Sequence, residues 1–401
     1  RDDVESRGLG DVYKRQVLID IPMDVQKSVI DFEYPEKCEI RSYKPTTKGN
    51  YVQVRRVMAA LEEAEKPLIC IGGGVFAAHA ENEIRELADL MQIPVITTMM
   101  GISVFPDDDQ LFCGMIGTHG VKMANAAVNE CDVLFLVGAR VGDRAVKTPL
   151  ALEKTTKIIH IDIDPAEIGK NIGADLPLVG DAKLVLQQMT ELAKPMKHDE
   201  WIAHIKTLGG ERKYVEPAKG TVNPRVFIDR LAKKMPANVT VVADVGQNQI
   251  WTCTEYKFRK EGRLLTSGGM GTMGYSVPAA IGAKMADNSR ATVAICGDGA
   301  FQMSFMELAT AVQFGVDIKV VVMTNNRLGM VRELQTNGYH DRQTAVFLDG
   351  SPDFIKLAEA YGIPAMRVYD DDTMEKGVEM LAEHKGICLV EVVVDKDMPT
   401  L

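Results

Sequence analysis

Short apolar runs rich in valine and isoleucine alternate with segments of helical period along most of this 401-residue chain. Strands that are apolar on both faces are typical of parallel sheets covered by helices. The alternation therefore predicts an α/β fold made of doubly wound parallel sheets. The expected strands are residues 67–71, 133–137, 157–161, 239–243, 292–296, 318–323 and 387–394, and two expected helices are 82–91 and 301–314.

A charged and polar stretch near residues 186–223 interrupts this alternation. It contains Lys194-Pro195, Gly209-Gly210 and Pro217, which are typical of a connecting segment. We therefore expect one α/β domain over residues 35–192, a linker over 193–222 and a second domain over 223–401. Residues 1–16 are charged and lack apolar periodicity, and residues 17–22 then begin abruptly like a strand.

Composition and charge exclude several classes of protein. The formal net charge is -10, which disfavours nucleic acid and anionic membranes as partners. No apolar run approaches 18 residues, and the N-terminal residues contain no apolar h-region, so we expect neither a membrane span nor a secretory signal. The seven cysteines form no C-x-x-C pair, so we expect reduced, buried thiols in a cytoplasmic protein. They are Cys38, Cys70, Cys113, Cys131, Cys253, Cys296 and Cys388.

Gly297-Asp298-Gly299-Ala300 joins the expected strand 292–296 to the expected helix 301–314. A turn of this kind directs backbone N–H groups outward, and the helix dipole favours an anion there. Asp298 lies at the carboxyl end of the strand, where α/β proteins bind ligands.

Asn325 follows the next expected strand, 318–323, and should emerge at the same edge of the sheet. The side-chain oxygens of Asp298 and Asn325, with phosphate oxygens and the backbone carbonyl of Arg327, suit an octahedral magnesium ion. Two ordinary strand-to-helix turns are the alternative interpretation.

The two turns belong to a wider resemblance: the chain from residue 17 onward resembles the thiamine diphosphate-dependent decarboxylases and carboligases. Within that family it is most similar to the catalytic large subunits of acetolactate synthase. The segments that carry the resemblance are residues 241–249, 269–275, 297–299 and 325–332.

The resemblance implies a role for each matching residue. Asp298 and Asn325 would be magnesium ligands through their side chains, and Arg327 through its carbonyl. Met273 would hold the two cofactor rings in a V shape, with core packing as the alternative, and Gly271 would offer its carbonyl to the aminopyrimidine. The diphosphate contacts would be Gly246, Gln247, Asn248, Gly297, Gly299 and Ala300; Asn248 replaces the commoner histidine.

The first domain would bind FAD in a structural role. Gly72 and Gly73 follow the strand 67–71, and their turn cradles a phosphate or serves tight packing. Val141-Gly142-Asp143-Arg144 replaces the usual Phe-Asp-Asp-Arg of the family. Arg144 would bind the carboxylate of the second substrate, with an ion pair to Asp143 as the alternative. The FAD contacts would be Gly72, Gly73, His119, Gly138, Arg140, Asp162 and Asp181.

The implied reaction decarboxylates pyruvate on thiamine diphosphate and joins the product to a second pyruvate or to 2-oxobutanoate. Both products feed the synthesis of branched-chain amino acids. Met330 and Leu334 belong to the implied active site, and Leu334 replaces a tryptophan that favours 2-oxobutanoate. We therefore expect a weaker preference for that acceptor. The resemblance also implies a homodimer or tetramer and a small regulatory subunit.

In this family the glutamate that activates the cofactor lies in an N-terminal pyrimidine-binding domain. Residues 1–34 are expected to hold a non-matching leader and the end of that domain, so we expect a fragment that is inactive alone. Two alternatives stay open. One is another carboligase or decarboxylase, such as catabolic acetolactate synthase without FAD or glyoxylate carboligase; the other is a non-catalytic cofactor-binding module.

Overall fold

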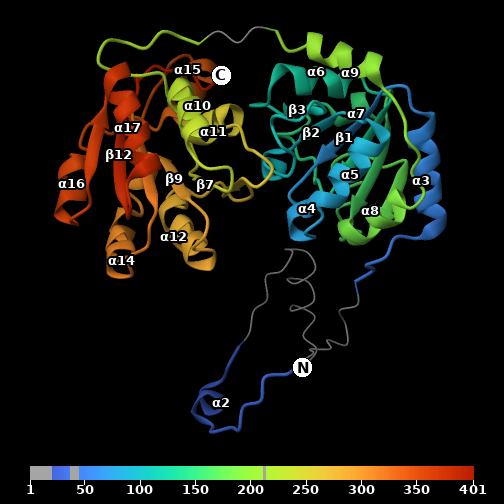
Figure 1. Cartoon of the computed structure of the whole chain (residues 1–401), viewed down its shortest axis with the longest axis horizontal. Coiled ribbons are helices and arrows are strands. Elements are labelled where there is room, and N and C mark those ends of the chain that lie inside the picture. The colour runs from blue at the N-terminus through green and yellow to red at the C-terminus, as the bar shows by residue number, and fades with distance from the viewer. Residues whose placement is uncertain (1–19, 37–44, 211–213) are drawn as a thin grey trace. The chain divides into compact units, whose positions relative to one another are not determined.

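The computed structural model describes residues 20–36, 45–210 and 214–401 (Figure 1). The expectations for residues 1–16, for residues 17–19 and for Cys38 lie outside this part of the chain. The chain divides into two compact units, and the first covers residues 1–44. In its described part, helix α2 (Met23–Lys27) has no buried residue, and the strand-like residues 20–22 are in no strand. Residues 45–401 form the second unit, which contains both sheets.

The first sheet has six parallel strands in the order β3-β2-β1-β4-β5-β6. Its strands are β1 (Pro67–Ile71), β2 (Val95–Thr97), β3 (Phe112–Met115), β4 (Val133–Val137), β5 (Lys157–Asp162) and β6 (Leu176–Val179). The accompanying helices are α3 (Tyr51–Glu63), α4 (Gly74–Ala77), α5 (Glu81–Met91), η1 (Met99–Gly101), α6 (Lys122–Glu130), α7 (Pro149–Leu152), α8 (Ala182–Thr190) and α9 (Asp199–Thr207).

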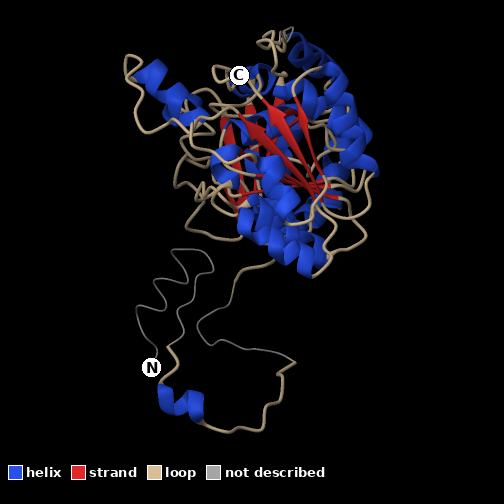
Figure 2. Cartoon of the chain, turned by 90° about the vertical axis from the view of Figure 1, so that its left-hand side faces the viewer, coloured by secondary structure: helices blue, strands red, loops and turns tan. Residues whose placement is uncertain are grey.

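The second sheet also has six parallel strands, in the order β11-β12-β10-β9-β7-β8, and Figure 2 shows helices beside them. Its strands are β7 (Thr240–Ala243), β8 (Arg263–Thr266), β9 (Thr292–Gly297), β10 (Lys319–Thr324), β11 (Ala365–Val368) and β12 (Cys388–Val393). Its helices are α10 (Pro224–Lys234), α11 (Gln247–Glu255), α12 (Ser276–Ala286), α13 (Asp298–Phe301), η2 (Phe305–Glu307), α14 (Leu308–Gln313), α15 (Gly329–Gly338), α16 (Phe354–Ala360) and α17 (Asp371–Glu383).

The predicted α/β class is confirmed by these two parallel sheets, and all seven predicted strands are present. The five strands that the sequence pattern missed have only three or four residues each, so they carry too little periodicity to be recognised. The domain boundaries stay a prediction. Within the predicted linker lies α9, whose Trp201 is buried and donates a hydrogen bond to the carbonyl of Pro67 (3.0 Å).

The predicted continuous helix over 301–314 is wrong, because α13, η2 and α14 divide this segment. Ser304 interrupts the helical backbone with φ -143° and ψ 9°. The loop before α12 packs against the break: a Cβ atom on Gly274 would lie 2.9 Å from the Cβ of Met303. Tertiary contact therefore accompanies a break that helical periodicity does not predict.

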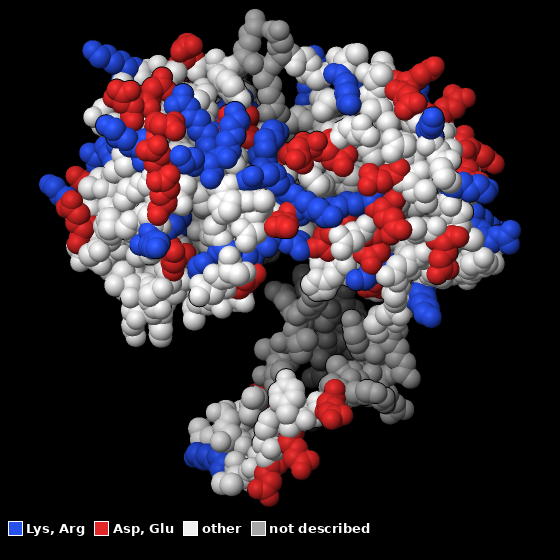
Figure 3. Space-filling view, viewed as in Figure 1, with Lys and Arg blue, Asp and Glu red and all other residues white. Residues whose placement is uncertain are grey.

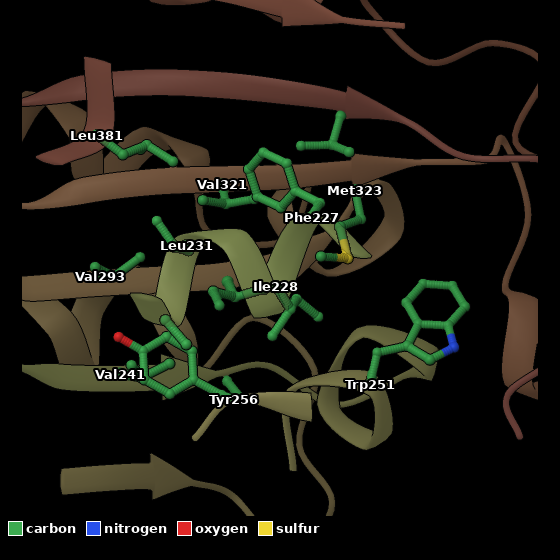
Figure 4. Packing of buried hydrophobic residues seen from close by; sticks show 14 of the residues in the cluster. Phe227, Ile228, Leu231, Val241, Trp251, Tyr256, Val293, Val321, Met323 and Leu381 are labelled. Carbon is green, nitrogen blue, oxygen red and sulfur yellow. The ribbon is translucent and has the colours of Figure 1, made fainter. Parts of the chain in front are cut away.

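Helix α10 illustrates how the hydrophobic core beside the second sheet is built. Its cap Asn223 accepts hydrogen bonds from the backbone of Arg225 and Val226, and Pro224 opens the first turn. The helix buries Phe227, Ile228 and Leu231 in the core that also contains β-strand valines such as Val241, Val293 and Val321 (Figure 4). Each such side chain contributes about 1.5–3 kcal/mol when fully buried.

Hydrogen bonds and an ion pair also connect residues around the first sheet with residues around the second sheet. The Phe258 N–H donates to Oδ2 of Asp107 (2.9 Å), and the Leu264 N–H donates to the hydroxyl of Ser103 (2.9 Å). Arg263 pairs with Glu81. Among the described residues, no helix is long and apolar enough to cross a membrane.

The turn after β1 leaves no room for a side chain. A Cβ atom on Gly72 would lie 2.1 Å from the carbonyl oxygen of Gly138, at the end of the neighbouring strand β4. We expect Gly72→Ala to lower the free energy of unfolding by about 3 kcal/mol, because two backbones must separate. Gly282→Ala in α12, where no atom lies within 4 Å of the new Cβ, is the matched control. Urea unfolding measures both, and an equal effect would contradict the packing argument.

Candidate functional site

Asp298 lies where β9 ends, directly beside the end of β10, because Met323 pairs with Gly297 in parallel register. Its Oδ2 accepts hydrogen bonds from the backbone N–H groups of Asn325 (3.2 Å) and Asn326 (2.6 Å). Its Oδ1 accepts one from Gly299 (2.8 Å). The structure therefore brings the two predicted side-chain ligands of magnesium together.

Burial dominates the electrostatics of this carboxylate. Asp298 is 2% exposed, and burial raises its pKa to about 6, although the backbone N–H groups act in the opposite direction. A bound cation would offset the cost of holding this charge away from water. No group of three or more His, Cys, Asp or Glu side chains that suits a metal occurs in the described ranges. A magnesium ion here would therefore need phosphate and carbonyl oxygens, which are ligands that magnesium prefers.

Asn325 is held from two sides. Its Nδ2 donates to Oε1 of Gln247 (3.2 Å), and its Oδ1 accepts from the Arg327 backbone N–H (3.1 Å). The side chain of Arg327 pairs with Asp349 (2.8 Å) and lies over the ring of Phe347 (4.6 Å). No described residue donates a hydrogen bond to the Arg327 carbonyl, so this oxygen is available for a further ligand.

The segment between β7 and α11 carries the next predicted contacts. Gly246 has φ 141°, a conformation that favours glycine, and it caps the first turn of the nine-residue α11. The side-chain donors of both following residues are already used. Gln247 Nε2 donates to the Met398 carbonyl (2.9 Å), and Asn248 Nδ2 donates to the Asp244 carbonyl (2.8 Å). The first backbone N–H groups of α11 are therefore the donors left for an anion.

Met273 lies close to the turn at residues 297–300. Its methyl carbon lies 3.4 Å from the position that a Cβ atom on Gly299 would take, and Leu328 lies closer still, at 2.8 Å. Gly297 is partly exposed, whereas Ala300 is buried in α13.

Gly271 lies on the exposed loop before α12 with φ 66°, and its N–H donates to the Ser267 carbonyl (2.9 Å). The structure therefore brings Met273 to the turn but leaves Gly271 on the surface of the described part.

Asp244 is a site residue that the sequence analysis did not single out. It has no exposed surface, and its two oxygens accept hydrogen bonds from the backbone of Val245 (2.8 Å), Gly274 (3.0 Å) and Ser276 (2.7 Å). It thereby ties the end of β7 to the loop that carries Met273. An acidic residue directly after a buried strand was the available signal.

The predicted FAD contacts divide into two groups. Two carboxylates already serve local turns: Asp162 accepts from the Asp164 N–H (2.9 Å), and Asp181 caps α8 by accepting from the Leu184 N–H (3.2 Å). The glycines Gly72, Gly73 and Gly138 lie at the carboxyl ends of β1 and β4, and Arg140 is exposed.

Arg144, which was predicted to bind the second substrate, lies beside the loop that carries His119. The Thr118 N–H donates to the Arg144 carbonyl (2.8 Å), so the loop of His119 packs on the loop of Arg144. Burial lowers the pKa of His119, whereas the charge of Glu333 on α15 raises it. The exposed Arg144 makes no ion pair with Asp143 or another described residue.

Helix α15 also carries Met330 and Leu334. Met330 is partly buried, and 61% of Leu334 is exposed, so Leu334 is open to a ligand.

Comparison with known proteins identifies the two domains that carry these residues. Residues 244–392 match the C-terminal TPP binding domain of thiamine pyrophosphate enzymes, and residues 54–189 match their central domain. A probable acetolactate synthase large subunit from Methanocaldococcus jannaschii is 40% identical over 94% of this chain and 66% of its own length.

Two further relatives give the same result. The acetolactate synthase large subunit of Buchnera aphidicola is 36% identical over 90% of this chain and 64% of its own. The acetolactate synthase of Arthrospira platensis is 39% identical over 95% of this chain and 68% of its own. The chain thus spans about two thirds of the length of these relatives.

We expect Asp244→Ala to lower the free energy of unfolding by about 3 kcal/mol, because the buried N–H of Ser276 and the partly buried N–H groups of Val245 and Gly274 lose their carboxylate acceptor. Asp353→Ala is the matched control: Asp353 also accepts from two backbone N–H groups, but at an exposed helix cap, and its loss costs about 1 kcal/mol. Urea unfolding, with hydrogen exchange at Gly274 and Ser276, checks the difference. Unchanged protection of these two amides would contradict the role of Asp244.

Proposed function

The chain belongs to the acetolactate synthase large subunits among the thiamine pyrophosphate enzymes, and on that premise we propose that it supplies the magnesium and diphosphate side of their active site. The observation that carries this proposal is the buried Asp298 carboxylate beside Asn325 at two adjoining strand ends. The reaction would decarboxylate pyruvate and join the product to a second pyruvate or to 2-oxobutanoate.

Asp298, Asn325 and the carbonyl of Arg327 would hold the magnesium ion, whose remaining ligands would be diphosphate and water oxygens. When bound, thiamine diphosphate supplies the nucleophilic carbon for the attack on pyruvate. Met273 would support its rings, since a thioether fills irregular space against aromatic groups. The diphosphate would meet backbone N–H groups of Gln247, Asn248, Gly299 and Ala300 beside Gly246 and Gly297, and the aminopyrimidine would meet the carbonyl of Gly271.

FAD would bind the first sheet, at the carboxyl ends of β1 and β4. The turn glycines, Arg140 and the partly buried His119 suit an anionic dinucleotide, whereas Asp162 and Asp181 would have to share their existing backbone bonds. Visible flavin absorbance that stays with the protein through gel filtration would support this assignment. A colourless protein after incubation with FAD would refute it.

Arg144 would bind the carboxylate of the acceptor, because a planar guanidinium matches a carboxylate and Arg144 has no ion-pair partner among the described residues. Met330 and Leu334 on α15 would contact the acceptor side chain. We also propose a homodimer or tetramer with a small regulatory subunit, because the relatives from Methanocaldococcus jannaschii and Buchnera aphidicola are named large subunits. A cytoplasmic location is supported by the six described cysteines, which are all free and buried.

Ligand binding tests the site directly. Thiamine diphosphate with Mg²⁺ at about 100 times its Kd should add about 2.7 kcal/mol to the free energy of unfolding of the wild-type chain. Asp298→Ala should lose this gain because the ion loses its buried carboxylate. Asp372→Ala, at an exposed position of α17, should keep it. Thermal unfolding with and without both ligands makes the measurement, and a gain that survives in Asp298→Ala would contradict the site.

Leu334, which would contact the acceptor substrate, gives a second test. Leu334→Trp should raise the preference of the active enzyme for 2-oxobutanoate over pyruvate by about 1–3 kcal/mol, since the larger flat side chain adds contact with the larger acceptor. Leu334→Ala serves as the size control and should retain a weak preference. A competition assay that quantifies both products decides the matter. A strong 2-oxobutanoate preference before any substitution would show that Leu334 does not set it.

A further inference from the structure

A chain of hydrogen bonds leads from the candidate magnesium ligand to a carboxylate on another helix. Asn325 donates through Nδ2 to Oε1 of Gln247 (3.2 Å), and Gln247 donates through Nε2 to Oε2 of Glu333 (3.3 Å). Glu333 belongs to α15, whereas Gln247 opens α11. The loop after β10, helix α11 and helix α15 therefore meet at one amide group.

The neighbours of Gln247 decide which way its amide faces. Its Nε2 lies 2.9 Å from the Met398 carbonyl and also faces the Glu333 carboxylate, and both of these groups only accept hydrogen bonds. The nitrogen must therefore face them, which turns Oε1 toward Asn325. Asn325 in turn presents Nδ2 to Gln247 and keeps Oδ1 on the side of the Arg327 N–H, at the strand end beside Asp298.

Glu333 is itself fixed in position. The Thr400 N–H donates to its Oε2 (3.1 Å), and the Thr400 hydroxyl donates to the same oxygen. Gln247 is 4% exposed, and Glu333 is partly buried, so water competes little for these bonds. The carboxylate is the charged acceptor of the network and binds its donors more strongly than a neutral acceptor would.

Gly329 provides the space that this arrangement needs. A Cβ atom on Gly329 would lie 1.9 Å from Oε1 of Gln247 and 3.0 Å from Nδ2 of Asn325. Its backbone is not in the left-handed region, so an alanine here would meet the Gln247 amide without backbone strain. The first turn of α15 can approach Gln247 only because this position lacks a side chain.

From these contacts we infer that Glu333 is a positioning residue for the magnesium ligand Asn325 and acts through Gln247. The inference rests on the proposed function, because it assumes that Asn325 binds the metal. Groups that hold a metal ligand in place commonly change metal affinity by about 10- to 100-fold when they are removed. Glu333 should therefore affect metal binding although it does not touch the ion.

The test is the binding of Mn²⁺, an EPR-visible substitute for Mg²⁺, to the chain in the presence of saturating thiamine diphosphate. Glu333→Ala should raise the Kd for Mn²⁺ by about tenfold or more. Glu333→Gln should stay close to wild type, because its amide oxygen can still accept from Gln247. Gln335→Ala is the matched control: Gln335 also links α15 to a neighbouring loop, at Thr344, and its removal should leave the Kd unchanged.

Gly329→Ala tests the same network without touching Glu333. It should weaken Mn²⁺ binding and alter the EPR signal of bound Mn²⁺, whereas Gly338→Ala at the other end of α15 should not, since its new Cβ would meet only Leu334, at 4.0 Å. Wild-type affinity in both Glu333→Ala and Gly329→Ala would overturn the inference. So would a Glu333→Gln variant as weak as Glu333→Ala. If the wild-type chain binds no Mn²⁺ with thiamine diphosphate, the proposed function itself fails and the inference with it.

Discussion

The parallel pairing of β9 with β10 is the constraint on which the candidate site depends. Its register sets Met323 opposite Gly297, so the residues just beyond each strand emerge side by side. Asp298 then accepts hydrogen bonds from the two asparagine N–H groups that follow β10. A carboxylate held this way is buried, and burial raises its pKa. The strand pairing thus creates a charge that a cation would stabilise.

Glycine residues near this carboxylate allow neighbouring side chains to pack closely against the backbone. Leu328 and Met273 fill the volume next to Gly299, and the Gln247 amide fills the volume next to Gly329. Gly246 adopts a backbone conformation that favours glycine and allows α11 to begin beside the strand ends. Close backbone approach therefore replaces side-chain bulk around the N–H groups that we propose for the diphosphate.

Much of this arrangement was predictable from local patterns. Strand ends followed by Gly-Asp-Gly and by Asn-Asn place Asp298 and Asn325 at one edge, because right-handed crossovers bring consecutive parallel strands near each other. The break near Ser304 was not predictable in this way, since the 301–314 segment has helical period but packs against Gly274. The helix cap role of Asp181 was also missed, because an acidic residue after a strand suits a ligand and a helix cap equally well.

The sequence by itself determined the α/β class, the strands that are apolar on both faces and the residues that follow them. These properties depend on periodicity and on turn chemistry, which act over a few neighbouring residues. Only the tertiary structure decided which atoms of Gln247 and Asn325 face one another, and that Asp244 holds the loop of Met273. Those outcomes depend on hydrogen bonds between residues 30 to 153 positions apart, and no local pattern specifies them.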